Sequence, residues 1–279
     1  MSLKGVAKHT LEIVERGEYT SPSGASISVR NGVDAAIRGT MLYRPEALVA
    51  LATSGNPSSN AAPPRIEITD ETTGTAARRL IETEDLRDVV ALNFASAKNP
   101  GGGFIGGAKA QEEDLARCSA LYACLVTQPD YYANNRASES MLYTDHIIYS
   151  PAVPFFRDDL LDLLDRPFSL AIITAPAPNA GEALRRDASV APAVRSTLHS
   201  RAGHVLAVAR DRGHRALVLG AWGCGVFRND PHDVAETFAQ WLAHPRFRGA
   251  FDHVTFAVYD RSEARTNLRA FEARFENAR

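Results

Sequence analysis

Residues 89–115 read VVALNFASAKNPGGGFIGGAKAQEEDL, and the order of elements in this stretch decides the fold. The apolar run Val89–Phe94 predicts a buried strand, and the acidic segment that begins near Ala110 predicts a helix. Five glycines lie between the two elements. Glycine permits positive φ and lets a ligand approach backbone amides, and a helix N-terminus favours anions. The stretch therefore predicts an anion-binding loop, with a plain turn between two elements as the alternative.

Short apolar or β-branched runs recur along the chain and alternate with helical patterns. Strands are predicted at 66–69, 89–94, 146–149, 170–174, 216–219 and 254–259. Helices are predicted near residues 6–14 and 35–37, at 115–126, 194–209 and 234–242, and around Leu268, Phe271 and Phe275. This alternation is typical of an α/β fold, in which helices cover both faces of one mostly parallel sheet.

We predict a single domain with an N-terminal addition. Residues 1–60 are expected to form a helical extension packed on the core, and residues 61–279 the core itself. The stretch TSGNPSSNAAPP at 53–64 interrupts every periodic pattern and predicts a loop between them. Ligands of such folds bind at the carboxyl ends of the strands, which is where the glycine loop lies.

The composition narrows the class of protein. Hydrophobic residues make up 45% of the 279 residues and charged residues 23%, which is the balance of an ordinary globular protein. The net charge of -2 argues against electrostatic wrapping of nucleic acid. Three cysteines and eight scattered histidines show no metal-ligand spacing, so we expect no metal site. No apolar run approaches the length of a membrane span, so we expect a cytoplasmic protein.

Gln111, Glu112 and Glu113 fall in the first turn of the predicted helix. The helix dipole alone favours acidic residues there, which is the simplest explanation of them. If the helix is continuous over 115–126, its apolar stripe turns away from Glu113, and small residues continue the face that Glu113 shares. We therefore expect Glu113 to overhang a packed cleft with a raised pKa, as a general acid requires. Glu112 is rotated about 100° from it, so one residue would transfer a proton while the other positions a hydroxyl.

A second glycine-rich stretch, LGAWGCGVFRND at 219–230, also follows a predicted strand and leads into a helix. Gly220, Gly223 and Gly225 would let backbone amides close around a diphosphate, and Phe227 offers a flat wall for a sugar. Plain packing at a strand end is the alternative. The first loop has neither the G-K-[ST] ending of a P-loop nor the acidic ribose partner of a Rossmann fold. Two loops at the ends of strands predict one ligand held between them.

The sequence resembles a known family at these same residues. GGG at 101–103, followed after seven residues by QEE at 111–113, is similar to the signature of poly(ADP-ribose) glycohydrolases. The surrounding text, with IYSPAVPFFRDD and GAWGCGVFRND, resembles the bacterial-type branch of that family over roughly residues 65–260. The resemblance implies a three-layer α/β/α macrodomain with a mixed, mostly parallel sheet. It also implies hydrolysis of the ribose–ribose O-glycosidic bonds of poly(ADP-ribose) from chain ends, releasing ADP-ribose without a cofactor.

The resemblance assigns roles to individual residues. Glu113 would be the catalytic acid and base, and Glu112 would bind ribose hydroxyls. Asn99 would contact the terminal ribose, the two glycine loops would hold the diphosphate, and Phe227 would pack against the distal ribose. The full set of implied substrate-binding residues is Asn99, Gly101, Gly102, Gly103, Phe104, Gly106, Gly107, Gln111, Gly220, Gly223, Cys224, Gly225, Val226 and Phe227.

The implied partners are poly(ADP-ribose), ADP-ribose and ADP-ribosylated proteins, with no membrane and no direct nucleic-acid contact. The family resemblance further implies a role in reversing ADP-ribosylation and in the DNA damage response, and we expect a monomer. Two alternatives keep the fold: a macrodomain that reads ADP-ribose without catalysis, and a hydrolase that removes single ADP-ribose groups from proteins. The adenine contact stays open between Phe256 or Tyr259 as the stacking ring and Glu67 or Thr69 as the hydrogen-bond partner.

Overall fold

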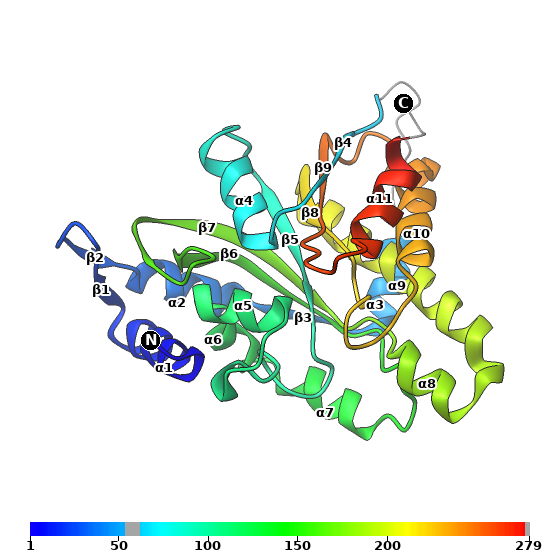
Figure 1. Cartoon of the computed structure of the whole chain (residues 1–279), viewed down its shortest axis with the longest axis horizontal. Coiled ribbons are helices and arrows are strands. Elements are labelled where there is room, and N and C mark those ends of the chain that lie inside the picture. Colours follow the sequence, from blue (N-terminus) through cyan, green and yellow to red (C-terminus); the bar gives the residue numbers. More distant parts are fainter. Residues whose placement is uncertain (54–61, 277–279) are drawn as a thin grey trace.

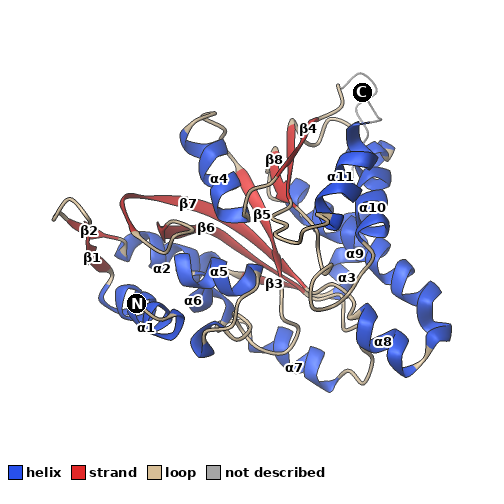
Figure 2. Cartoon of the chain, in the orientation of Figure 1, coloured by secondary structure: helices blue, strands red, loops and turns tan. Residues whose placement is uncertain are grey.

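The computed structural model describes residues 1–53 and 62–276, which form a central sheet with helices on both faces (Figures 1 and 2). The helices are α1 (Leu3–Arg16), α2 (Arg30–Gly39), α3 (Pro45–Thr53), α4 (Thr73–Glu82), α5 (Gln111–Cys118), α6 (Leu121–Leu125), α7 (Pro129–Ala137), α8 (Ala180–Arg186), α9 (Ala191–Asp211), α10 (Pro231–Ala243) and α11 (Thr266–Glu276), with 3-10 turns η1 (Phe104–Gly106), η2 (Ala188–Val190) and η3 (Pro245–Phe247). The strands are β1 (Glu18–Thr20), β2 (Ser26–Ser28), β3 (Met41–Tyr43), β4 (Arg65–Thr69), β5 (Val89–Phe94), β6 (Ile147–Arg157), β7 (Leu163–Ala175), β8 (Ala216–Leu219) and β9 (His253–Ala257).

The main sheet confirms the predicted α/β class. Its seven strands have the order β3-β6-β7-β5-β8-β9-β4, and β1 and β2 form a separate hairpin. β7, β5, β8, β9 and β4 are parallel, whereas β6 is antiparallel to both of its neighbours, so the sheet is mixed and mostly parallel. Because β5 and β8 are parallel neighbours, their carboxyl ends meet at the same edge of the sheet. The two glycine loops therefore start side by side.

The core consists of one hydrophobic layer on each face of the sheet. Val90 and Leu92 of β5 belong to the same buried cluster as apolar residues of α3, α9, α10 and α11. Val89 and Ala91, which point the other way, belong to a cluster with residues of α1, α2, α4, α5 and α6. A strand that is covered on both faces has no exposed side to mark with polar residues, which is why β5 is an almost continuous apolar run.

The predicted helix over 115–126 is wrong in its continuity. α5 ends at Cys118, Ser119 is extended with φ -146° and ψ -179°, and α6 begins at Leu121. Ser119 forms a β-bridge with Phe155, and the N–H of the next residue donates to the Pro154 carbonyl at 3.0 Å. The chain thus gives up one turn of helix to hydrogen-bond with β6. The apolar stripe predicted for a continuous helix over 115–126 therefore does not describe the surroundings of Glu113.

The predicted N-terminal extension contributes to the core in two ways. β3 pairs with β6 at the edge of the main sheet, and α3 contacts α9. α1 instead contacts η1 and α5, beside the first glycine loop (Figure 1). Most of the predicted loop at 53–64, and the boundary at residue 60, lie outside the described residues, so the division into two parts stays a prediction. Within the described ranges, no helix is long and apolar enough to span a membrane.

Candidate active site

The first glycine loop folds its bare backbone against two carboxylates. Gly102 has φ +57°, a left-handed conformation that favours glycine. A Cβ at this position would lie 2.9 Å from Glu113 Cδ and 3.2 Å from Glu112 Oε2. The next residue, Gly103, donates its N–H to Glu113 Oε1 at 2.9 Å. The glycines are therefore needed because both carboxylates approach the main chain more closely than a side chain would allow.

Glu112 is the buried member of the pair. The residue is only 2% exposed. Its carboxyl group accepts hydrogen bonds from Ser96 N at 2.7 Å and Asn93 Nδ2 at 3.2 Å. Burial raises the pKa of Glu112 to about 8, and the neighbouring Glu113 adds to the effect, while the hydrogen bonds from Ser96 and Asn93 oppose it. No Lys or Arg of the described residues forms an ion pair with this carboxyl group.

The two neighbouring glutamates differ in their exposure to solvent. Glu113 is only partly buried, and Glu112 occupies the desolvated position. The physical reason is the start of α5 at Gln111, which turns Glu112 toward the end of β5 and leaves Glu113 at the rim under Gly103. Glu113 therefore has one carboxylate oxygen held by the backbone and faces the exposed side of the loop.

Gln111 connects α5 to the end of β5. Its Oε1 accepts from Phe94 N at 2.8 Å, and its Nε2 donates to Leu92 O at 2.8 Å and to Thr73 Oγ1 at 3.0 Å. Both donors and the acceptor of this amide are thus used inside the protein. Its predicted contact with substrate stays a prediction, and the geometry favours a role in fixing where α5 begins.

Phe104 anchors the loop from beneath. Its ring is fully buried and packs against Tyr122 with 4.9 Å between ring centroids, in a small cluster with Ala7 of α1 and Ala116. The ring therefore holds the loop in place, and the predicted contact of residue 104 with a ligand, which its backbone could make, stays a prediction. Asn99, by contrast, is exposed, and its carbonyl accepts from Gly102 N at 3.0 Å within the turn.

Arg117 supports the far end of the same loop. It is fully buried, donates from Nη1 to the Ala108 carbonyl at 2.7 Å, and pairs with Asp114 through Nη2. Its own carbonyl accepts from Thr10 Oγ1 of α1 at 2.6 Å. A buried arginine in this position connects α1, α5 and the loop, so Arg117 has a structural role.

The second glycine loop lies at the end of β8, next to the first. A Cβ on Gly220 would lie 2.5 Å from the Ala257 carbonyl oxygen and 3.1 Å from Phe94 Cζ, so this glycine is required by packing between neighbouring strand ends. Gly225 faces open space, and Val226 is 83% exposed. Phe227 is half-buried, with its ring 5.8 Å from that of Tyr143. The accessible part of this loop is therefore its tip, at 225–227, with Cys224 partly covered behind it.

Two side chains that the sequence analysis did not single out hold the second loop. Asn229 donates from Nδ2 to the carbonyls of Pro178 at 2.9 Å and Gly223 at 3.1 Å, and Trp222 Nε1 donates to the Ala175 carbonyl at 3.2 Å. Asn229 thus connects the loop to the segment after β7, and Trp222 connects it to the last residue of β7. Asn93, which holds Glu112, was also missed, although an asparagine inside the apolar strand VVALNF is a recognisable signal of a buried polar contact.

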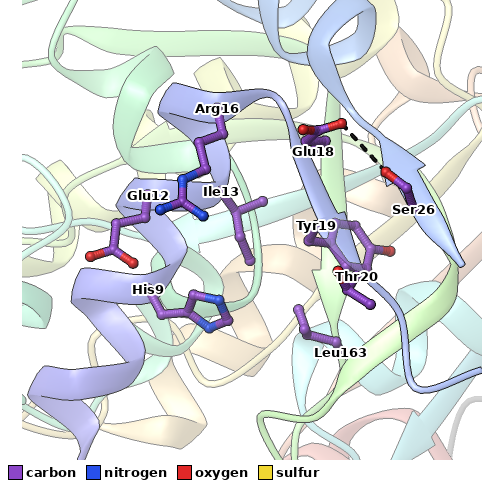
Figure 3. Close-up of a pocket in the computed structure, with 9 residues that line it drawn as sticks. All are labelled: His9, Glu12, Ile13, Arg16, Glu18, Tyr19, Thr20, Ser26 and Leu163. Carbon is purple, nitrogen blue, oxygen red and sulfur yellow. Dashed lines mark hydrogen bonds between the residues drawn. The ribbon is translucent and has the colours of Figure 1, made fainter. Parts of the chain in front are cut away.

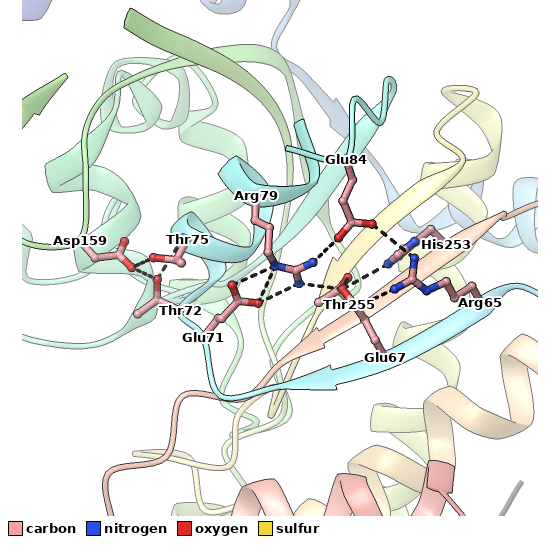
Figure 4. Close-up of polar contacts among 10 residues, drawn as sticks. All are labelled: Arg65, Glu67, Glu71, Thr72, Thr75, Arg79, Glu84, Asp159, His253 and Thr255. Atoms are coloured by element: carbon pink, nitrogen blue, oxygen red, sulfur yellow. Dashed lines mark hydrogen bonds and ion pairs between the residues drawn. The ribbon is translucent and has the colours of Figure 1, made fainter. Parts of the chain in front are cut away.

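The open question about adenine is narrowed by the structure. Phe256 is fully buried and stacked on Phe275 with 4.6 Å between centroids, so its ring is not available to a ligand. Glu67 is already engaged by Arg79 and Thr255 (Figure 4). Tyr259 is 50% exposed, and the Thr69 hydroxyl is buried without a hydrogen-bond partner within the described ranges. Tyr259 and Thr69 therefore remain as candidates.

A separate cavity lies away from the carboxylates. It has a volume of about 310 Å³ between α1 and the β1–β2 hairpin, and its lining includes His9, Glu12 and Tyr19 (Figure 3). None of the predicted site residues lines it. In the part of the chain that the structure describes, no three His, Cys, Asp or Glu side chains gather closely enough to hold a metal ion.

Comparison with known proteins identifies the arrangement. Residues 7–158, more than half of the 279 residues, match the family described as "Microbial-type PARG, catalytic domain". No curated protein matches the chain. Poly(ADP-ribose) glycohydrolase (PARG) from Thermomonospora curvata is 50% identical, with a TM-score of 0.92 over 98% of this chain and 99% of that chain.

Two ligand complexes give the same result. The Thermomonospora curvata enzyme bound to the inhibitor ADP-HPD is 49% identical, with a TM-score of 0.90 over 98% of this chain and 99% of that one. PARG from Deinococcus radiodurans in complex with ADP-ribose is 50% identical, with a TM-score of 0.81 over 88% of this chain and 98% of that one. The paired glutamates beside two glycine loops are thus the candidate active site of a chain that belongs to the microbial-type PARG family.

Proposed function

We propose that this chain hydrolyses the ribose–ribose O-glycosidic bonds of poly(ADP-ribose), acts from chain ends, and uses Glu113 as general acid and base. The observation that carries the proposal is the contact between Glu113 Oε1 and Gly103 N at 2.9 Å. It leaves the second carboxylate oxygen of Glu113 free to meet a ligand at the exposed side of the loop. The family membership and the relatives that bind ADP-ribose and ADP-HPD support the same choice of substrate.

In the proposed reaction the glycine loops hold the diphosphate of the terminal ADP-ribose unit. Glu113 in its acid form protonates the oxygen of the departing ribose, and the C–O bond breaks to leave an oxocarbenium ion on the retained ribose. The nearby diphosphate stabilises that positive charge. The Glu113 carboxylate then removes a proton from a water molecule, whose oxygen bonds to the anomeric carbon. The cycle consumes one water and returns Glu113 to its acid form.

Glu112 is assigned to orienting the retained ribose. Its carboxyl group is held by Ser96 N and Asn93 Nδ2 at the end of β5, so it is a fixed hydrogen-bond partner for ribose hydroxyls. Because burial raises the pKa of Glu112 to about 8, its protonated form is favoured near neutral pH compared with an ordinary carboxyl group. A protonated carboxyl both donates and accepts, which suits a pair of neighbouring hydroxyls.

The test is incubation of purified protein and its Glu113→Gln form with poly(ADP-ribose), following free ADP-ribose. We expect release by the first, and a loss of about 1,000-fold or more in the second with ADP-ribose binding retained. Glu15→Gln, which removes an exposed carboxylate of α1, is the matched control and should behave as wild type. Equal release by the Glu113→Gln form would remove Glu113 from the mechanism.

Product size and substrate choice separate the remaining alternatives. Action from chain ends predicts monomeric ADP-ribose from the earliest time points, whereas internal cleavage would first yield oligomers. A reader of ADP-ribose would bind the polymer and release nothing. A mono-ADP-ribosyl-protein hydrolase would release ADP-ribose from a singly modified protein faster than from the polymer. The cytoplasmic location, the monomeric state and the action on ADP-ribosylated proteins also remain proposals.

A further inference from the structure

The lysines of this chain are few and gathered in two places. Of its 31 lysine and arginine residues only four are lysines, and they are Lys4, Lys8, Lys98 and Lys109. Two lie in the first half of α1, and the other two stand at either end of the first glycine loop. All four are exposed. In a chain with a net charge of -2, this gathering of positive charge is a local feature and not a general one.

The fold brings α1 and the glycine loop together. A Cβ on Gly107 would lie 3.3 Å from Lys4 Cγ and 3.5 Å from Lys4 N, so the stem of Lys4 rests on the loop. Lys109 follows two residues later. A Cβ on Gly103 would lie 2.9 Å from the Ala108 side chain, and Gly103 N itself holds Glu113. Lys4 and Lys109 therefore stand beside the backbone that carries the Glu113 carboxylate.

Lys98 lies at the opposite end of the same loop. It precedes Asn99, whose carbonyl fixes Gly102 N at 3.0 Å. Arg136 of α7 donates from Nη1 to the Lys98 carbonyl at 2.5 Å and so places an exposed guanidinium next to it. We call Lys4, Lys98 and Lys109 the lysine rim. Its three members lie at the two ends of the loop whose backbone contacts Glu113.

The ammonium groups of the rim form no ion pair with any described residue. Within the described ranges, the only lysine in an ion pair is Lys8, which lies 3.8 Å from Glu12, and every other Lys or Arg ion pair is made by an arginine. The planar arginine fork suits fixed bidentate partners, whereas lysine is a hydrated point charge on a flexible stem. Unpaired lysines are therefore suited to an anion that has no fixed position.

We propose that the lysine rim binds the diphosphate of the ADP-ribose unit that adjoins the bond being cut, on the departing side of the polymer. This inference rests on the proposed function. If Glu113 protonates the departing ribose oxygen, the rest of the polymer must lie on the exposed side of Glu113, next to the loop whose two ends carry the rim. Each further unit carries a negatively charged diphosphate, and the glycine loops are occupied by the terminal one. The rim thus increases affinity for the polymer without contributing to the binding of free ADP-ribose.

The experiment compares two variants, each with three substitutions added to Glu113→Gln, so that the polymer is bound and not cut. The first replaces Lys4, Lys98 and Lys109 by Gln. The control removes the same charge with Arg87, Arg166 and Arg248 replaced by Gln. These three side chains are exposed. Each lies just before or in the first part of a strand whose carboxyl end points toward the site, so the control charges lie at the end of the sheet opposite the site. Binding of poly(ADP-ribose) and of monomeric ADP-ribose is measured at low and high salt.

We expect the rim variant to bind the polymer about tenfold more weakly at low salt, with a smaller difference at high salt because salt screens exposed charges. The affinity of the rim variant for monomeric ADP-ribose should equal that of the Glu113→Gln parent. The control should bind both ligands as the parent does. Unchanged polymer binding by the rim variant, or an equal loss in the control, would overturn the inference. Equal weakening for monomer and polymer would overturn it too, because the charges would then act on the terminal unit. Failure of the wild-type protein to release ADP-ribose would instead overturn the proposed function.

Discussion

Glu112 and Glu67 are both largely removed from water, yet folding moves their pKa values in opposite directions. Glu112 is 2% exposed, meets only uncharged donors, and has its pKa raised by burial to about 8. For Glu67, burial acts in the same direction, but hydrogen bonds from Arg79, Thr255 and His253 outweigh it and lower the pKa to about 2. The difference lies in the cation, because a desolvated carboxyl group without one is costly, and Glu112 has no Lys or Arg partner whereas Glu67 has Arg79.

The network around Glu67 has a structural role (Figure 4). Arg79 of α4 lies 2.7 Å from Glu67 and 2.8 Å from Glu71, and also pairs with Glu84. Arg65 adds longer contacts to Glu67 at 3.5 Å and Glu84 at 3.4 Å. The network thereby fastens the edge strand β4 to α4, far along the sheet order from β5. Each carboxylate there has an arginine, whereas the pair at Glu112 and Glu113 has backbone amides.

The largest test of this contrast is Glu112→Gln. We expect kcat on poly(ADP-ribose) to fall about 100-fold, because the retained ribose loses its fixed partner. The variant should nevertheless gain stability at alkaline pH. Folding raises the pKa of Glu112 from 4.5 to about 8, so the stability it contributes is complete below pH 4.5 and is lost as pH rises through about 8.

The measurement is chemical denaturation of both proteins between pH 4.5 and pH 9, together with turnover. The introduced amide keeps the acceptor for Ser96 N, and the unpaired Asn93 Oδ1 is available to accept from its NH₂ after a flip of the Asn93 amide. The free energy of unfolding of the variant should exceed that of wild type by a growing margin, on the order of a few kcal/mol at pH 9. A constant difference over this range would show that Glu112 does not titrate as described.

Gly102→Ala tests whether the lack of a side chain at Gly102 is what allows the two carboxylates to approach the main chain. The added Cβ would meet Glu113, and φ +57° costs an alanine about 1 kcal/mol. We expect kcat/KM to fall about 30-fold as Glu113 is displaced. Gly213→Ala, in the turn between α9 and β8, is the matched control, since φ is +75° there and a Cβ meets nothing within 4 Å. Similar losses of activity in the two variants would mean that backbone strain and not the contact at Gly102 lowers kcat/KM.

The smallest effect on activity is expected at the arginine network. Arg79→Met leaves Glu67, Glu71 and Glu84 without their shared cation and should lower the free energy of unfolding by about 1 to 2 kcal/mol, with turnover per folded molecule unchanged. Arg78→Met, on the same helix, removes an exposed pair with Glu82 and should cost less than about 0.5 kcal/mol. Thermal unfolding and turnover are measured for both variants, and the loss of stability should be larger in Arg79→Met than in Arg78→Met. Loss of turnover in folded Arg79→Met protein would contradict a purely structural network.

Much of the site could be predicted from local pattern. A glycine loop between an apolar strand and an acidic helix start can be recognised in the amino-acid sequence. Parallel neighbouring strands then place two such loops at the same end of the sheet. The same reasoning failed over 115–126, where periodicity favoured one helix and Ser119 instead pairs with β6. The helical pattern of α4 at 73–82 and the short strand β3 were also missed, because their apolar residues are too few to show a period.

The sequence by itself determined the alternation of strands and helices, the places where bare backbone follows a strand, and the presence of two adjacent carboxylates. The tertiary contacts set which carboxylate is desolvated, which acidic residues meet an arginine, and that Lys4 of α1 lies against the first glycine loop. The physical reason is that periodicity records which face of an element is covered, whereas burial and charge depend on the elements that cover it. Glu112 is buried because Asn93 and Ser96 close over it from the end of β5, and that neighbour is set by the path of the chain.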